Sequence, residues 1–139
     1  MKTTEFKLGP KTLYLYFNGE AMFQLNELDK DQPEDAPDWI ARMLENTLEG
    51  KRLLCKAAHI LATQGELCRR YLQYDPERVP TEDDLQLLVT PMAIVGLRSA
   101  VMAAIDDGFS AKSQDDDGDI DVGLAELEKK TKPLRSRLI

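Results

Sequence analysis

The sequence predicts a mainly α-helical fold, a small helical domain with an N-terminal β-hairpin and a long central helix. Apolar residues recur at helical spacings of three and four through most of residues 19–105, whereas a two-residue alternation is confined to the N-terminal stretch. The chain has 139 residues, of which 42% are hydrophobic and 31% charged. That balance is typical of a single globular domain whose core needs neither a metal nor a disulfide.

The N-terminus is expected to form the hairpin, with strands over residues 5–8 and 12–17 joined by a turn at Gly9 and Pro10. The second strand is apolar on both faces, with Leu13, Leu15 and Phe17 on one and Tyr14 and Tyr16 on the other. Such a strand needs cover on each side. We expect it to pack on helices or to pair with a second copy of the chain.

Two short helices are expected next. Asn18 can cap the first, which starts at the following residue. Residues 29–37 hold two prolines and four acids, which indicates an exposed loop. Asp38 can cap the second helix, over residues 39–48, and Gly50 is expected to mark a break or a bend.

The central helix is predicted over residues 51–74, where apolar and small residues follow a rhythm of four and three: Leu54, Ala58, Leu61, Gly65, Cys68 and Leu72. Pro76 is expected to end it, because the residue before a proline is pushed out of the helical region. Its solvent-facing side is predicted to carry Lys51, Lys56, Gln64, Arg69 and Arg70.

Two further helices follow, each with a capping threonine. Thr81 is followed by three acids, and Leu85, Leu88 and Val89 are then expected to face inward. Thr90 and Pro91 open a helix over residues 92–105, for which Gly108 is the expected C-cap. A broad apolar face predicts deep burial of this helix, through Ile94, Val95, Leu97, Val101, Met102 and Ile105.

Charge divides the chain into three parts: a hairpin and helical core domain (1–109), an acidic loop (110–121), and a charged helix with a basic tail (122–139). The net charge is −7, and residues 106–121 hold seven acids against one lysine. An acidic chain is not expected to bind nucleic acid. No run of about eighteen apolar residues predicts a membrane span, and no signal peptide is indicated, so we expect a cytoplasmic protein.

The acidic loop resembles a calcium-binding loop in part. With Gly118 in the sixth position, Asp115, Asp117 and Asp119 occupy the third, fifth and seventh. The first position is then a serine and the twelfth a leucine, so two usual ligands are missing. These aspartates are weak metal candidates, and the expected state is a solvated loop without a cofactor.

Residues with other chemistry are sparse. Cys55 and Cys68 would lie about 20 Å apart on one helix, too far for a disulfide. Together with His59 they provide too few convergent ligands for zinc, and we expect all three to be structural. The sequence has no glycine-rich phosphate loop and no nucleophile elbow. We therefore expect no catalytic residues and a protein that is not an enzyme.

The order of the segments resembles the tail assembly chaperones of long-tailed bacteriophages and prophages of Gram-positive bacteria. The segments that carry the resemblance follow the hairpin: Asn18-Gly19-Glu20-Ala21-Met22-Phe23, Gly65-Glu66-Leu67-Cys68-Arg69-Arg70-Tyr71-Leu72, Pro80-Thr81-Glu82-Asp83-Asp84-Leu85 and Ala125-Glu126-Leu127-Glu128-Lys129-Lys130-Thr131. The resemblance implies a non-enzymatic protein of the host bacterial cytoplasm that self-associates. It would bind the tape measure protein and keep it soluble while the tail tube assembles, with the tail-tube protein as a further partner.

The residues expected to bind this helical partner lie on the second strand and the first helix: Tyr14, Tyr16, Phe17, Met22 and Phe23. They belong to the apolar elements least suited to complete burial, and an apolar groove for a helix is the expected mode of contact. A helical adaptor or regulatory protein with an acidic, calcium-binding loop is the alternative hypothesis, and an enzyme of unrecognised type is a third.

Overall fold

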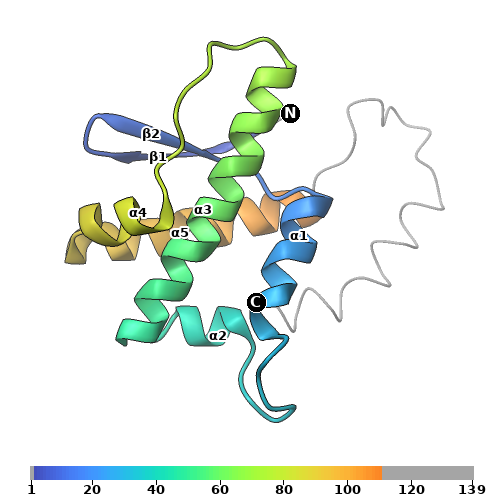
Figure 1. The fold of residues 1–139 in the computed structure, drawn as a ribbon, viewed down its shortest axis with the longest axis vertical. Helices are drawn as coiled ribbons and strands as arrows, with labels where there is room; N and C mark the ends of the chain where they lie inside the picture. Colours follow the sequence, from blue (N-terminus) through green and yellow to red (C-terminus); the bar gives the residue numbers. More distant parts are fainter. Residues whose placement is uncertain (1, 111–139) are drawn as a thin grey trace, which may run out of the picture.

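The computed structural model of the chain describes residues 2–110. Its elements are, in order, β1 (Thr4–Leu8), β2 (Lys11–Leu15), α1 (Gly19–Asn26), the 3-10 turn η1 (Glu27–Asp29), α2 (Trp39–Met43), α3 (Leu48–Tyr71), α4 (Glu82–Leu88) and α5 (Pro91–Ser110). The predicted fold class is confirmed, because a hairpin precedes a long central helix in a mainly helical protein (Figure 1).

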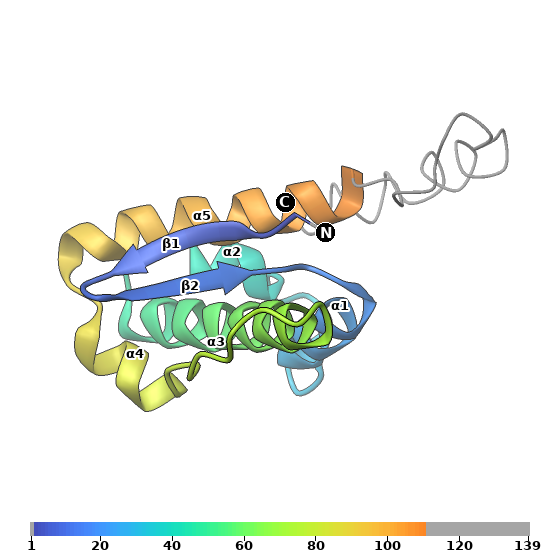
Figure 2. The same ribbon diagram turned by 90° about the horizontal axis from the view of Figure 1, so that it is seen from above.

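The hairpin lies between the two longest helices. Its strands are antiparallel, with Thr4 opposite Leu15 and Leu8 opposite Lys11, and Gly9 makes the turn with a φ of 62°. Figure 2 shows β1 running along α5 and β2 running along α3. Helix cover for the second strand is therefore confirmed. The side chains of Leu13 and Leu15 on this strand are completely buried.

The seam between β2 and α3 depends on a glycine. A Cβ atom at Gly65 would lie 1.7 Å from the carbonyl oxygen of Tyr14, so only glycine lets the strand backbone approach this closely. One turn earlier, the Leu61 carbonyl accepts a hydrogen bond of 3.1 Å from the backbone N–H of Tyr16. The strand is thus joined to the helix by backbone contact as well as by side chains.

The predicted caps are present. Asn18 accepts a hydrogen bond of 2.9 Å from the Ala21 N–H, and Asp38 accepts one of 2.9 Å from the Ala41 N–H. Thr81 and Asp84 form a reciprocal capping box at the start of α4. The hydrogen bonds from Thr81 lower the pKa of the Asp84 carboxyl. These short-range signals fix where the helices begin.

The boundary between α2 and α3 differs from the prediction. Helix α2 ends at Met43, and Thr47 caps α3 by accepting a 2.9 Å hydrogen bond from the Gly50 N–H. Gly50 therefore lies inside the first turn of α3, where a Cβ would meet the Glu45 carbonyl oxygen at 2.3 Å. It serves close packing and is not a helix break. The same helix ends at Tyr71, earlier than predicted, and Gln73 follows with a φ of 70°.

Gly108 and the solvent-facing side of α3 also differ from the prediction. Helix α5 continues through Gly108, whose missing side chain makes room for Phe17: a Cβ there would lie 2.5 Å from the Phe17 carbonyl oxygen. Gln64 is buried, and its side-chain oxygen accepts a 3.0 Å hydrogen bond from the Asn18 side chain. Arg69 is mostly buried as well, packed on Tyr14.

Apart from Ser110, the acidic loop and C-terminal helix predicted for residues 110–139 lie outside the described residues. Within residues 2–110, none of the helices has both the length and the apolar character that crossing a membrane requires.

Candidate protein-binding site

The structure places the five predicted binding residues in different environments. Phe23 is 65% exposed, whereas Tyr14, Tyr16 and Met22 are half-buried. Phe17 is only 8% exposed, and its ring packs against Phe109 with 5.1 Å between centroids. Phe17 is therefore a core residue, and its assignment to a binding surface is corrected. Its burial follows from the close approach of the chain to α5 at Gly108.

The outer face of β2 is partly covered by a cation. The Arg69 guanidinium lies 4.2 Å from the centre of the Tyr14 ring and 5.4 Å from that of Tyr74. Arginine stacked on an aromatic face excludes other ligands from that face. The hairpin thus presents less free apolar surface than its sequence suggested.

A group of exposed apolar side chains lies where α4 meets α5. Leu87 is 84% exposed and Met92 83% exposed, with Val95 at 62% and Leu88 at 47%. These four residues are called the α4–α5 corner below. Leu88 and Val95 were expected to face inward, and their exposure shows that this prediction was wrong. Leu97 and Val101, which were also expected to face inward, are buried.

Local structure explains this exposure. Leu85 and Val89 are four residues apart and buried, so Leu87, two residues from each, points to the opposite side. Pro91 then starts α5, and the Thr90 hydroxyl accepts a 3.2 Å hydrogen bond from the Ala93 N–H. Met92 and Val95 are three residues apart, so they share one helix face.

Hydrogen bonds hold the corner against the rest of the fold. Lys51 on α3 donates to the Gln86 carbonyl oxygen at 2.9 Å. Arg98 on α5 donates to the Asn46 side chain at 2.8 Å and to the Glu45 carbonyl oxygen at 2.9 Å. The exposed apolar side chains therefore stand on helices that are fixed to the domain.

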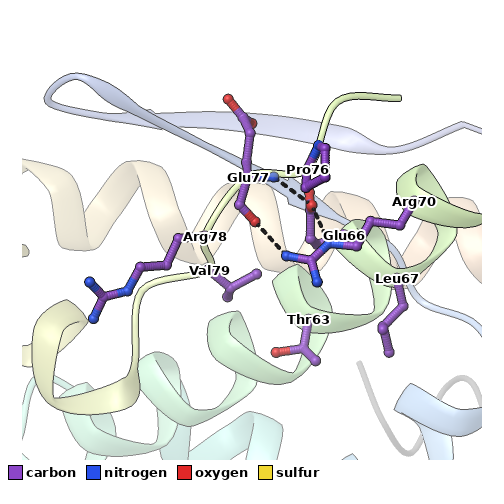
Figure 3. Close-up of a pocket in the computed structure, with 8 residues that line it drawn as sticks. All are labelled: Thr63, Glu66, Leu67, Arg70, Pro76, Glu77, Arg78 and Val79. Atoms are coloured by element: carbon purple, nitrogen blue, oxygen red, sulfur yellow. Dashed lines mark hydrogen bonds and ion pairs between the residues drawn. The ribbon is translucent and has the colours of Figure 1, made fainter. Parts of the chain in front are cut away.

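A second exposed apolar surface surrounds the C-terminal end of α3. Tyr71 is 85% exposed, with Tyr74, Leu67 and Leu72 between 49% and 58%. Beside it, the loop between α3 and α4 borders a groove of about 330 Å³ (Figure 3). The walls of this groove include Thr63, Leu67, Arg70, Pro76, Arg78 and Val79. We call it the α3 groove.

Glu66 is the buried hub of the α3 groove. Its carboxylate accepts hydrogen bonds from Arg69 at 2.7 Å, from Arg70 at 2.8 Å and from the Glu77 N–H at 2.7 Å. Burial by itself would raise the pKa of Glu66, but the hydrogen bonds from Glu77, Arg70 and Arg69 outweigh it and lower the pKa. Glu66 is therefore a fixed anion at neutral pH. It anchors the loop to α3.

The remaining candidates for chemistry are His59 and the two cysteines. The His59 Nδ1 lies 2.8 Å from the Pro80 carbonyl oxygen, which fits its predicted structural role. Both cysteines are free, and burial raises the pKa of each thiol. Among residues 2–110, His, Cys, Asp and Glu form no group of three that could hold a metal ion. The weak candidates Asp115, Asp117 and Asp119 lie outside the described residues.

Two buried charges were missed at the sequence level. Arg42 is 8% exposed and donates to Asp29 at 2.6 Å, to Glu49 at 3.1 Å and to the Pro37 carbonyl oxygen at 3.2 Å, so it fastens the loop before α2. Glu66 is the other. The spacing of Glu66 to Arg69 and Arg70, three and four residues along a helix, was a usable signal for that ion pair.

Comparison of the chain with known protein families, with curated proteins and with solved structures finds no match.

Proposed function

We propose that this protein is a non-enzymatic tail assembly chaperone, which binds the tape measure protein of a long-tailed phage in the host cytoplasm and assists assembly of the tail tube. The observation that supports this most is the α4–α5 corner, where Leu87 and Met92 are each more than 80% exposed. Large apolar side chains gathered on a rigid surface mark sites of protein interaction.

The form of the corner suits a helical client. Met92 and Val95 follow one face of α5, and Leu87 and Leu88 stand at the end of α4 only a few residues away. An amphipathic helix presents its own apolar side chains at spacings of three and four, so it can pack across such a surface. Phe23 and the α3 groove offer further contacts for a long client.

The proposal includes self-association, but through a different surface from that first expected. The second strand was one expected place for a second copy to pair, but the strand packs on α3, where the Tyr16 N–H donates to the Leu61 carbonyl oxygen. The exposed corner is the better surface for a second copy when no client is bound. The tail-tube protein is a further partner within the same proposal.

Co-expression tests the function. A fragment of the tape measure protein encoded beside this chain is produced with the parent chain and with the double variant Leu87→Ser, Met92→Ser. We expect a soluble complex on gel filtration with the parent and an insoluble fragment with the double variant. Gln24→Ser, an exposed polar change on α1, is the matched control and should behave as the parent.

Two results would change the conclusion. If Phe23→Ser abolishes the complex while the corner variant retains it, the client site lies on α1. If the fragment stays insoluble with the parent chain and no complex forms, the chaperone proposal fails in favour of the helical adaptor.

A further inference from the structure

The α3 groove combines apolar walls with arginines, which distinguishes it from the α4–α5 corner. Leu67, Pro76 and Val79 provide the apolar part. In Figure 3, Val79 lies between the side chains of Arg70 and Arg78, and these arginines come from α3 and from the loop that follows it. An apolar groove with cations beside it suits a ligand that carries both apolar and anionic groups.

The acids of the groove are already engaged. Glu66 accepts three hydrogen bonds, and the Glu77 carboxylate lies 3.8 Å from the Arg69 Nη1. Arg70 uses its Nε for Glu66 and its Nη2 for the Glu77 carbonyl oxygen. These contacts are internal to the domain. They leave little negative charge free to neutralise another cation.

Arg78 is the cation that remains. It is exposed, and within residues 2–110 its guanidinium makes no hydrogen bond or ion pair. Its carbonyl oxygen accepts a 3.4 Å hydrogen bond from Lys11, which brings a second positive charge to the same loop. The charge of Arg78 contributes to the lowered pKa of Asp84, but that carboxylate already accepts a hydrogen bond in the capping box of α4.

We propose that the α3 groove selects client segments in which a carboxylate stands among leucine-like side chains, the acidic form of amphipathic helix. This inference rests on the proposed function and specifies which helices are bound. The carboxylate pairs with Arg78, and the apolar side chains contact Leu67 and Val79. Lys11 lies beside Arg78, so two positive charges favour an acidic segment at this position.

Fluorescence anisotropy with two labelled synthetic peptides tests the proposal. One is a leucine-bearing amphipathic helix with glutamates beside its apolar stripe, and the other replaces every glutamate with glutamine. We expect the full chain to bind the glutamate peptide more tightly, by up to about fivefold, the upper limit for one exposed ion pair. Arg78→Glu should remove that preference. Arg52→Glu, an exposed change toward the other end of α3, should preserve it.

Equal binding of the two peptides by the parent chain, or an unchanged preference in Arg78→Glu, would overturn the selection of acidic helices. The double variant Leu87→Ser, Met92→Ser separates this outcome from failure of the proposed function. If both peptides bind equally and both are lost with that variant, helix binding stands and only the role of the α3 groove falls.

Discussion

The β2–α3 seam and the α4–α5 corner are both rich in apolar residues, but one is closed and the other is open. In the seam, Leu13 is 2% exposed and Leu15 1% exposed. In the corner, Leu87 and Met92 are more than 80% exposed. A hydrophobic pattern shows which residues share a face of a helix or strand. Whether another element covers that face depends on contacts with segments that are distant in the sequence.

Glycines account for much of the difference. Gly65 lets the backbone of β2 lie directly on α3, and Gly108 lets Phe17 lie directly on α5. At the corner, the nearby Gly96 instead faces Phe6 of β1, so it helps to seat the hairpin. The exposed side of α5 has no such partner among the described residues. This contrast assigns stability to the seam and leaves the corner as the surface that we propose for binding.

Replacing the buried phenylalanine should have the largest effect. Phe17→Ala removes a ring packed on Phe109 and should lower the free energy of unfolding by about 3 to 5 kcal/mol. Phe23→Ala removes a ring that is 65% exposed and should change stability by less than about 1 kcal/mol. Urea denaturation of both variants measures the difference. Equal losses would show that Phe17 is not part of the core.

Adding one methyl group to the seam should come next. The Cβ of Gly65→Ala would overlap the Tyr14 carbonyl oxygen, so the strand must move, and the free energy of unfolding should fall by about 3 kcal/mol. The matched control is Gly19→Ala at the start of α1, where the new Cβ meets no atom within 4 Å. It should change stability by less than about 1 kcal/mol in thermal unfolding. Similar results for the two would mean that β2 does not lie on α3.

The buried ion pairs of Glu66 should make the free energy of unfolding depend on pH in the acid range. Because the pKa of Glu66 is lower in the folded state, its contribution is complete above the unfolded value of about 4.3 and is lost as the pH falls through the folded value. Glu66→Gln should cost about 2 kcal/mol at pH 7, the size of hydrogen bonds to charged groups. Denaturation curves at several acid pH values should show that the free energy of unfolding falls less steeply with decreasing pH in this variant than in the parent. An unchanged slope would remove Glu66 as the anchor of the loop.

Removing apolar side chains from the corner should have the smallest effect on stability. Leu87→Ser should alter the free energy of unfolding by no more than about 0.5 kcal/mol, because the side chain is exposed. Leu85→Ala, two residues earlier and fully buried, should cost about 2 to 5 kcal/mol. Chemical denaturation compares them directly. A large loss in Leu87→Ser would show that the corner is covered in solution.

Short-range signals made most of the fold predictable. Asn18, Asp38 and Thr81 cap the helices that they were expected to cap, and Asp84 completes the box with Thr81. The missed helix start at Thr47 has the same chemistry as these caps. It was overlooked because Gly50 suggested a break, although glycine there serves close packing against the Glu45 carbonyl oxygen.

The candidate site was much less predictable, because exposure depends on contacts between distant segments. Phe17 was assigned to the surface, since nothing near it in sequence shows that it meets α5 near Phe109. Val95 was assigned to the core, since its helix is apolar on more than one side. Only the three-dimensional arrangement separates these two apolar residues.

Hydrogen–deuterium exchange of the chain with and without the tape measure fragment tests the division between seam and corner most directly. We expect the fragment to slow exchange of the backbone amides of residues 87–95, with no change in residues 4–17, which are already protected by the hairpin and its helices. Slower exchange confined to residues 4–17, with residues 87–95 unaffected, would contradict the assignment of client binding to the α4–α5 corner.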